Sequence, residues 1–428
     1  QDSSGHDGGS SWDIRGQLYD AAGATVGSET LVNTHISNDQ TVPDVTSLAD
    51  GGYVVTWASR YQDTGGSDYG VYGQRYNADG TTSGDEFLVN TWTASNQDYS
   101  SVAALSDGGF VVTWQDNSGH GGGSGYDIRG QRYSVNGEPS GNEFLANTWT
   151  SGNQYYPSVT GLDDGKFVVT WGDETTHANR PGDDKSGWGV YGQVFTTSDA
   201  EGDAAVAKSG DQFQLNTYTS STQHDVQVAT LTNGNFVATW YSAGTTDMRA
   251  QVFNDDGIKL GNEIAVSEYH NYGYSQPSIV ALADGGFTIS YMSDYKDDPN
   301  DTGHFHHSYG VFAKQFNSDG TPSAEARLVG GIADEIVVLA DQGQVGLSVD
   351  LGGGNDSLTL GDARDALTVA NVETVDLGGG DDFIQLLGTS SASVDGGTGD
   401  DNIFGGIGND VLAGGADNDV LSGGLGND

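Results

Sequence analysis

The feature that most constrains this fold is a unit of about 57 residues that the chain repeats. Four copies of a short apolar phrase end in tryptophan, at Trp57, Trp114, Trp171 and Trp240, and a fifth copy ends at Tyr291. The first three are evenly spaced, since 114 − 57 and 171 − 114 both equal 57. A fixed period of this length indicates a repeat architecture, in which each unit packs on its neighbours.

Each unit contains four short apolar segments, which we name A to D, separated by Gly-, Asp- and Asn-rich turns. Examples are PSVTGL from Pro157 (A), FVVTW ending at Trp171 (B), IRGQRY from Ile128 (C) and EFLANT from Glu143 (D). Segment C occurs six times, beginning at Ile14, Val71, Ile128, Val190, Met248 and Val311. Short runs rich in Val, Phe, Tyr, Trp and Thr between tight turns predict four antiparallel strands per unit.

Segment B is apolar almost throughout, which predicts a strand that is covered on both faces. A single twisted sheet of four strands cannot cover both of its faces, but a stack of such sheets can. The sequence therefore predicts an all-β fold in which residues 1–345 form a β-propeller of about six four-stranded blades. An array of two-sheet sandwiches is the alternative.

The first unit is incomplete in this sequence. The opening QDSSGHDGGSSWDIRGQLY aligns without a gap on QDNSGHGGGSGYDIRGQRY from Gln115, so only its segments C and D are present. We expect segments A and B to lie upstream in a longer protein, and the series of tail repeats described below to continue beyond Asp428. Alternatively, IVVLADQGQVGL from Ile336 supplies a late A–B hairpin and closes a six-bladed ring.

The charge balance narrows the possible partners. Fifteen Lys and Arg stand against 60 Asp and Glu, giving 15 − 60 = −45. Such a surface repels phosphate backbones and anionic lipids, so we expect neither nucleic-acid binding nor membrane insertion, and we expect divalent cations to matter. The chain has no cysteine, which excludes a disulfide scaffold. It shows neither a signal peptide nor an apolar run of about 18 residues.

Alternating strand direction places the B–C and D–A connections at one end of the predicted propeller. These connections are long and variable, so this end is the candidate binding face. Acidic and histidine side chains of these connections are candidates for additional metal sites. The alternative is that they form a solvent-exposed acidic rim without metal. They are Asp63, Asp68, Asp116, Asp127, Asp183, Asp184, Asp297, Asp298, Asp301, His304, His306 and His307.

Aromatic and glutamine side chains also recur in each unit. Aromatic residues of the same connections are candidates either for stacking on sugar rings or for sealing gaps between blades: Trp12, Tyr69, Trp92, Tyr126, Trp149, Trp188 and Tyr218. The tryptophans of segment B are predicted to be core residues. The repeated glutamines of segment C are predicted to hydrogen-bond between blades: Gln17, Gln74, Gln131, Gln193 and Gln251.

After about residue 345 the repeat becomes shorter. Glycine pairs begin at positions 396, 405, 414 and 423, a step of nine. The sixth position of each nonapeptide is aspartate, at Asp401, Asp410, Asp419 and Asp428, and the eighth is apolar, at Ile403, Leu412 and Leu421. Two looser copies, SVDLGGGND and TVDLGGGDD, end at Asp356 and Asp382.

Each feature of the nonapeptide has a physical consequence. Glycine permits turns with positive φ and exposes backbone carbonyls, and aspartate adds a charged oxygen. Stacked turns would align these oxygens around calcium. A single apolar residue in nine cannot offset the conformational entropy of the chain. Calcium is therefore predicted to supply folding free energy.

From Gly396 to Asp428 the chain resembles the hemolysin-type calcium-binding repeats of RTX proteins, with the pattern GGxGxDxUx. The match is partial where Leu351 and Leu377 replace the first glycine and where Asp417 replaces the fourth-position glycine. The resemblance implies that residues 346–428 form a parallel β-roll that binds calcium. It also implies export by a type I secretion system, with a signal outside this sequence, and an extracellular or cell-surface location.

The predicted calcium ligands are sixth-position carboxylates and backbone carbonyls of positions one, three and five. They are Gly396, Thr398, Asp400, Asp401, Gly405, Ile407, Asn409, Asp410, Gly414, Ala416, Asn418, Asp419 and Asp428, with Asp356 and Asp382 in the looser copies.

Three functional hypotheses fit these features. No GxSxG, HExxH or P-loop motif and no cysteine nucleophile is present, which favours a non-enzymatic protein. The first hypothesis is a secreted, calcium-binding structural or adhesive surface protein that self-associates. The second is an extracellular glycan-binding or glycan-degrading propeller with an RTX tail. The third is an accessory region of a calcium-dependent protease or lipase. The propeller-like portion, residues 1–345, also resembles repeats of large bacterial extracellular proteins that carry RTX tails. This resemblance implies no activity.

Overall fold

The structure is a computed structural model that describes residues 12–19, 25–63, 68–121, 123, 125–174, 187–198, 205–219, 221–243, 247–267, 277–295, 308–322, 327–329, 336–338 and 345–428. The chain divides into two compact units, Gln1–Ser267 with Gln276–Ala281, and Glu268–Ser275 with Leu282–Asp428. Apart from one 3-10 turn, every regular element in the described part of both is a β-strand. None of its helices is long and apolar enough to cross a membrane.

The first unit contains four antiparallel sheets of four strands each, in the predicted order A to D. Blade 2 is β3 (Gln40–Ser47), β4 (Tyr53–Arg60), β5 (Tyr69–Tyr76) and β6 (Phe87–Leu88). Blade 3 is β7 (Gln97–Ala104), β8 (Phe110–Asp116), β9 (Asp127–Tyr133) and β10 (Phe144–Leu145). Blade 4 is β11 (Gln154–Gly161), the 3-10 turn η2 (Asp163–Gly165), β12 (Lys166–Asp173), β13 (Gly189–Ser198) and β14 (Ala205–Gln214). Blade 5 is β15 (Gln223–Thr230), β16 (Phe236–Ser242), β17 (Asp247–Phe253) and β18 (Lys259–Ala265).

Two further parts of the repeat series lie in this unit. Strands β1 (Arg15–Tyr19) and β2 (Thr25–Leu31) pair antiparallel and correspond to segments C and D of the incomplete first repeat, here named blade 1. Strand β19 (Ser278–Ala281) corresponds to segment A of the repeat that follows blade 5.

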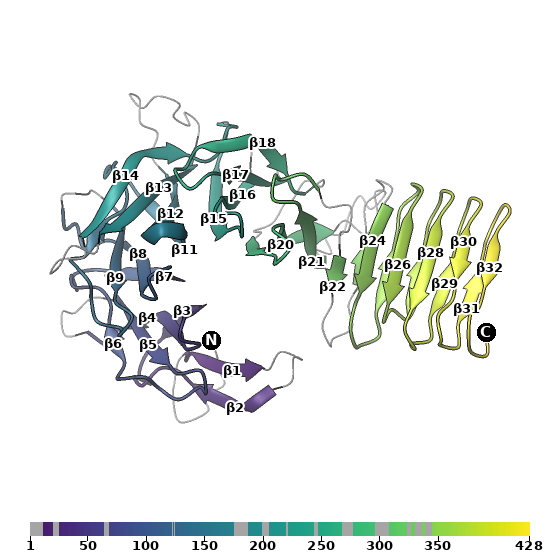
Figure 1. Ribbon diagram of the computed structural model, residues 1–428, viewed down its shortest axis with the longest axis horizontal. Helices are drawn as coiled ribbons and strands as arrows, with labels where there is room; N and C mark the ends of the chain where they lie inside the picture. The colour runs from purple at the N-terminus through teal and green to yellow at the C-terminus, as the bar shows by residue number, and fades with distance from the viewer. Residues whose placement is uncertain are drawn as a thin grey trace, which may run out of the picture. The chain divides into compact units, whose positions relative to one another are not determined.

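The core of this unit lies between successive blades. The first strands of the blades, β3, β7, β11 and β15, contact one another in turn on the inner side of the arc that Figure 1 shows. One buried cluster joins Val54 and Val71 of blade 2 to Phe110 and Trp114 of blade 3. The four segment B tryptophans have no exposed surface. Similar clusters join blades 1 and 2, 3 and 4, and 4 and 5, so the blades pack face to face in series. The propeller prediction is confirmed and the sandwich alternative is wrong.

The tight A–B turns depend on their paired glycines. In blade 3, Gly108 has φ +86°, and a Cβ on Gly109 would lie 2.3 Å from the carbonyl oxygen of Tyr133. The Asp107 carboxylate accepts a hydrogen bond of 2.8 Å from the Gly109 N–H. Only glycine fits both positions without strain.

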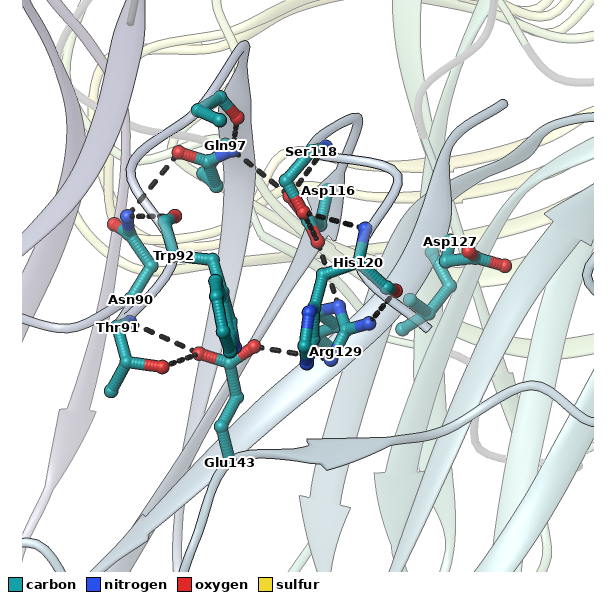
Figure 2. Close-up of polar contacts among 12 residues, drawn as sticks. Asn90, Thr91, Trp92, Gln97, Asp116, Ser118, His120, Asp127, Arg129 and Glu143 are labelled. Atoms are coloured by element: carbon teal, nitrogen blue, oxygen red, sulfur yellow. Dashed lines mark hydrogen bonds and ion pairs between the residues drawn. The ribbon is translucent and has the colours of Figure 1, made fainter. Parts of the chain in front are cut away.

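A repeated polar contact ties each blade to the next, and Figure 2 shows the copy between blades 2 and 3. Thr91 donates from its backbone N–H and hydroxyl to Glu143 Oε2, at 3.0 and 2.7 Å. Equivalent contacts join Thr34 to Glu86, Thr148 to Gln212 and Thr217 to Glu263. We call this the Thr–Glu latch. Sequence reasoning missed it.

The repeated glutamines of segment C act within blades, so the prediction that they link blades is wrong. Gln74 Nε2 donates to the carbonyls of Arg75 and Gly84 at 2.9 and 3.1 Å. Gln17, Gln131, Gln193 and Gln251 make the same kind of contact inside their own sheets. At Gln17, Gln193 and Gln251 the register between segments C and D shifts, so the side-chain amide satisfies carbonyls that the ladder leaves unpaired.

The second unit contains an antiparallel hairpin, β20 (Phe287–Tyr295) and β21 (Ser308–Phe316), and a parallel β-roll of two sheets. One sheet is β22 (Arg327–Val329), β24 (Val345–Asp350), β26 (Ala366–Ala370), β28 (Phe383–Leu387), β30 (Asn402–Phe404) and β32 (Val420–Ser422). The other is β23 (Ile336–Val338), β25 (Ser357–Thr359), β27 (Thr374–Asp376), β29 (Ser393–Asp395) and β31 (Val411–Ala413). Figure 1 shows successive coils of the roll side by side. The predicted roll is confirmed.

The late A–B hairpin that would close a six-bladed ring does not form. Ile336–Val338 pairs in parallel with Ser357–Thr359, and Val337 packs against the core of the roll. The segment EARLVG likewise contributes Arg327–Val329 to a parallel ladder, although we expected an antiparallel fourth strand there. Both segments precede the predicted boundary between residues 345 and 346, which stays a prediction.

Stability of the propeller should depend on pH through Asp98 in β7. Burial raises the pKa of this carboxyl to about 6. A hydrogen bond of 2.7 Å from Gln115 Nε2 lowers the pKa and offsets part of this effect. Its pKa is higher in the folded than in the unfolded chain, so stability falls as the pH rises from about 4 to about 6. We expect Asp98→Asn to add about 1 to 2 kcal/mol to the free energy of unfolding at pH 8 and little at pH 4.

Thermal unfolding followed by tryptophan fluorescence at both pH values measures this difference. The exposed Asp85→Asn serves as the control and should change stability by less than about 0.5 kcal/mol. Equal stabilisation by Asp98→Asn at pH 4 and pH 8 would contradict the assignment.

Candidate metal centre

The sixth-position aspartates of the roll form a hydrogen-bonded ladder. Asp401 Oδ1 accepts from the backbone N–H of Asp382 at 2.9 Å, and Asp419 Oδ1 accepts from that of Asp401 at 3.1 Å. Asp428 Oδ1 accepts from the N–H of Asp410 at 2.9 Å. The partners are 18 or 19 residues apart, so each coil contains two nonapeptides. The carboxylates therefore stack along the roll.

The sixth positions divide into two columns, one at the start of each sheet's strands. The first column precedes β26, β28, β30 and β32 and contains Asp365, Asp382, Asp401 and Asp419. The second precedes β25, β27, β29 and β31 and contains Asp356, Glu373, Ala392 and Asp410, followed one coil later by Asp428. The first column is acidic throughout, whereas Ala392 interrupts the second.

Sequence reasoning missed Asp365 and Glu373 as members of these columns. Asp365 donates its N–H to Asp382 Oδ1 at 2.7 Å, and Glu373 Oε2 accepts from the N–H of Asp356 at 2.9 Å. Both stand two residues before a buried apolar residue, Leu367 and Val375, as Asp401 stands before Ile403. That spacing was the available signal, although the glycines of the motif are missing here.

Two buried carboxylates of the first column keep one oxygen without a hydrogen-bond partner among the described residues. Asp382 and Asp401 are 1% and 0% exposed, and the atoms concerned are their Oδ2 oxygens. Burial, with Asp401 and Asp365 nearby, raises the pKa of Asp382 to about 7. Burial and the neighbouring carboxylates also raise the pKa of Asp401. Such oxygens are costly unless a cation compensates them.

The first glycine of each repeat leaves space beside the carboxylate. A Cβ on Gly396 would lie 2.4 Å from the Gly414 carbonyl oxygen and 2.5 Å from Asp401 Oδ2. Cβ atoms on Gly405 and Gly414 would meet Asp410 Oδ2 and Asp419 Oδ2 at 2.8 and 2.3 Å. The absence of side chains therefore lets carbonyl and carboxylate oxygens approach the same space.

The other predicted ligands lie in register along the roll. The carbonyls of Thr398 and Ala416 accept from the N–H groups of Gly380 and Gly399 at 2.8 and 3.3 Å, and Ile407 donates to the Gly388 carbonyl at 3.0 Å. In the fifth position, Asp400 Oδ1 accepts from Asn418 N–H and Asn409 Oδ1 accepts from Asn427 N–H, both at 2.9 Å. Calcium ligation by these residues stays a prediction.

The departures from the motif are accommodated without loss of the fold. Asp417 takes the place of glycine with φ +82°, a left-handed conformation that aspartate tolerates better than most residues. Leu351 and Leu377, which replace first-position glycines, are buried in the core of the roll. The looser repeats thus gain apolar burial where the strict repeats keep open space.

The donor set suits a hard cation. The described residues contain no group of three or more His, Cys, Asp or Glu side chains that could hold a metal by themselves. A site in the roll would therefore combine carboxylates with backbone carbonyls, as calcium accepts. Asp382 and Asp401 would be the charged ligands, with carbonyls of the glycine-rich turns beside them.

The acidic loops of the first unit are engaged differently. Asp116 Oδ2 lies 2.7 Å from Arg129 Nε in a buried ion pair, and Asp127 Oδ1 accepts from Asn147 Nδ2 at 2.7 Å. Arg60 Nε lies 2.9 Å from Asp68 Oδ1. These contacts stabilise loops. The candidates Asp183, Asp184, Asp297, Asp298, Asp301, His304, His306 and His307 lie outside the described residues.

The loop aromatics fall into two groups. Tyr126 and Trp188 pack across blade boundaries, with ring centroids 5.2 Å from Tyr155 and 6.2 Å from His224 respectively. Their contacts favour the role of sealing gaps. Exposed fractions of 39% to 45% distinguish the second group, which is Trp12, Trp92, Trp149 and Tyr218.

Comparison with known proteins identifies the tail. Residues 395–428 match the RTX calcium-binding nonapeptide repeat in four copies. No curated protein sequence matches the chain. Among solved structures, a protein of unknown function from Dyadobacter fermentans is similar at 12% identity and a TM-score of 0.43, over 66% of this chain and 80% of that one.

Two sugar-cleaving enzymes are similar at the same low level. The alpha-L-arabinofuranosidase of Fusarium graminearum shows 13% identity and a TM-score of 0.42, over 73% of this chain and 83% of that one. The alpha-L-arabinanase of Penicillium chrysogenum shows 14% identity and a TM-score of 0.40, over 59% and 77%. Likenesses this weak carry no argument about the function of this chain.

Removing one charge from the first column should weaken calcium binding. Asp401→Asn keeps the size of the side chain and an acceptor for the Asp382 N–H, but it removes a ligand charge. We expect the calcium concentration at the midpoint of folding to rise at least about tenfold. Asp395→Asn, an exposed aspartate of the same roll, is the matched control. Equal midpoints for the two variants in a calcium titration by circular dichroism would refute the column as the binding site.

Adding the missing carboxylate of the second column should have the opposite effect. Ala392 is buried, and its N–H donates to Asp410 Oδ1 at 2.9 Å. Ala392→Asp should destabilise the roll in chelator, because it buries a charge, and lower the calcium midpoint about two- to fivefold. Thr389→Asp adds the same charge at an exposed position. A shift of equal size in this control would show that only net charge matters.

Proposed function

We propose that this chain is a secreted, calcium-ordered structural and adhesive module of the bacterial cell surface. Residues 395–428 are calcium-binding RTX repeats. The observation that carries the proposal is the buried acidic column, in which one oxygen each of Asp382 and Asp401 has no hydrogen-bond partner among the residues that the structure describes. A chain that stacks such carboxylates needs a divalent cation to order them.

Apolar burial decreases along the roll. Strands β24, β26 and β28 each bury two apolar side chains, such as Leu367 and Val369 in β26. In β30 only Ile403 is fully buried among the apolar residues, and in β32 Val420 and Leu421 are 52% and 45% exposed. The dependence on calcium should therefore be strongest in the last coils, where little hydrophobic burial offsets chain entropy.

This dependence supports an extracellular site of action. Calcium modules outside cells work at about 10⁻⁴ to 10⁻³ M calcium, far above the range of intracellular sensors. At low calcium concentration the stacked carboxylates repel one another, which would keep the last coils unfolded during export. In abundant calcium they would order, and the roll would fold after passage outside.

The adhesive part of the proposal rests on the blades. Their buried cores and the Thr–Glu latch hold the B–C and D–A loops on a rigid frame. His120 of a B–C loop stacks on Trp92 of a D–A loop with centroids 3.5 Å apart, so both kinds of loop share one end. Loops fixed at one end of a scaffold form a continuous surface for partners or for another copy of the chain.

Calcium titration of the full chain tests this proposal with two signals. All 8 tryptophans lie between Trp12 and Trp240, so their fluorescence reports the propeller alone, whereas far-ultraviolet circular dichroism reports both parts. We expect β signal to increase with calcium while tryptophan fluorescence stays unchanged from its value in chelator. Light scattering should rise with calcium if copies associate.

Magnesium at the same concentration is the control, because it prefers fewer and more rigid protein ligands than calcium. Equal β signal with and without calcium would refute the coupling of ion binding to folding. Loss of tryptophan signal in chelator would show that the ions stabilise the propeller instead.

A further inference from the structure

Three successive D–A loops present an aromatic side chain at the same position. Trp92, Trp149 and Tyr218 each follow the threonine of the latch, and they are 45%, 41% and 39% exposed. The tryptophans of segment B, by contrast, are fully buried. Core packing therefore accounts for the tryptophans of segment B, but it does not account for the aromatic residues of the D–A loops.

The backbone that carries these aromatics is held rigidly. The buried Asn90, Asn147 and Asn216 donate through Nδ2 to the carbonyl two residues ahead, at 2.9, 2.8 and 2.8 Å. Their Oδ1 atoms accept from N–H groups near the start of the third strand of the same blade, those of Val71, Ile128 and Val190, at 2.8 to 3.1 Å. Exposed aromatic rings on rigid loops lose little entropy when a ligand covers them.

At Tyr218 the ring forms a wall of a pocket of about 390 Å³. The other lining residues are Thr217, Gln251, Lys259, Gly261, Asn262 and Glu263. Lys259 Nζ donates to Thr217 Oγ1 at 3.1 Å, and Glu263 Oε2 accepts from the Thr217 N–H at 2.6 Å. The volume lies within the range of about 300 to 1,000 Å³ that is typical of small-ligand sites.

The chemistry of this pocket selects its ligand class. It offers the Thr217 hydroxyl, the Asn262 amide, the Lys259 ammonium and the Glu263 carboxylate around one aromatic ring, so donors and acceptors are mixed. Lys259 and Glu263 cancel in charge. The site is thus close to neutral on a chain whose net charge is −45, which disfavours anions through the overall field and gives a cation no local excess of carboxylates. A neutral, polyhydroxylated ring with apolar faces fits it best.

The equivalent D–A loop between blades 2 and 3, which carries Trp92, shows that a planar ring can stack on the aromatic side chain. In Figure 2 the imidazole of His120 lies over the indole of Trp92, with centroids 3.5 Å apart and planes 18° apart. Glu143 lies beside it, bonded to Thr91 and 3.2 Å from Arg129 Nη1. An exposed side chain of the protein here occupies the position that a planar ligand would take.

We propose that the D–A loops form a row of carbohydrate subsites that bind a neutral polysaccharide, with Tyr218 and Trp149 each stacking on a sugar ring and Trp92 doing so once His120 moves off its face. Several weak subsites on one frame bind a long polymer more tightly than any one of them binds a monosaccharide. This inference does not depend on calcium, because the loops belong to the propeller.

Affinity electrophoresis of the full chain in native gels tests the proposal. The gels contain dextran, mannan, a β-glucan or arabinoxylan, with anionic alginate as the charged comparison. We expect retardation by at least one neutral polymer but not by alginate, in calcium and in chelator alike. Tyr218→Ala should weaken retardation at least about fivefold, whereas His120→Ala, which uncovers the Trp92 ring, should strengthen it.

The matched control is Tyr19→Ala, since Tyr19 is 63% exposed but lies in β1, away from these loops. Its retardation should equal that of the unmodified chain. Absence of retardation by every neutral polymer, or equal losses in Tyr218→Ala and Tyr19→Ala, would overturn the proposal. Because the gels are run with and without calcium, such a failure leaves the calcium titration unaffected.

Discussion

Packing of each repeat on the next one supplies the interior of both units, because neither a twisted four-stranded blade nor a nine-residue coil covers its own apolar face. In the propeller, Val54 of one blade and Trp114 of the next belong to the same buried cluster. In the roll, Leu367 and Ile384 of successive coils do the same. Stability in such an array is a sum of intrinsic and neighbour terms, so whatever joins neighbours decides whether the array folds.

The two units join their neighbours by different means. Blades are joined by apolar burial and by the Thr–Glu latch. Each latch contains at most one carboxylate, and that carboxylate accepts hydrogen bonds from the threonine. Coils use stacked carboxylates. Asp401 accepts a backbone hydrogen bond with one oxygen, and its other oxygen has no hydrogen-bond partner in the described part of the chain. The first arrangement is satisfied within the protein. The second would be completed by a cation, so we expect the fold of the roll to depend on its surroundings.

The features that could be predicted from the sequence are those that a local pattern determines. Strand order and the buried tryptophans follow from a period that each unit carries in full, and the acidic positions follow from the nonapeptide. The latch was missed because Thr91 and Glu143 are 52 residues apart, and neither residue alone suggests a contact between blades. Asp365 was missed because its repeat has lost the glycines. The segment from Ile336 was misassigned because a short apolar run suits an antiparallel or a parallel ladder equally.

Separation of the two kinds of contact has a functional consequence. The D–A loops are held by asparagine side chains that bond to strands of the same propeller, as Asn216 bonds to the Val190 N–H and the Tyr218 carbonyl. None of these bonds involves the acidic columns. Interactions that share no partners contribute additively, so removal of calcium should open the last coils without altering the exposed aromatics. Such a division would let the order of the roll change with the ion while the D–A loops keep their arrangement.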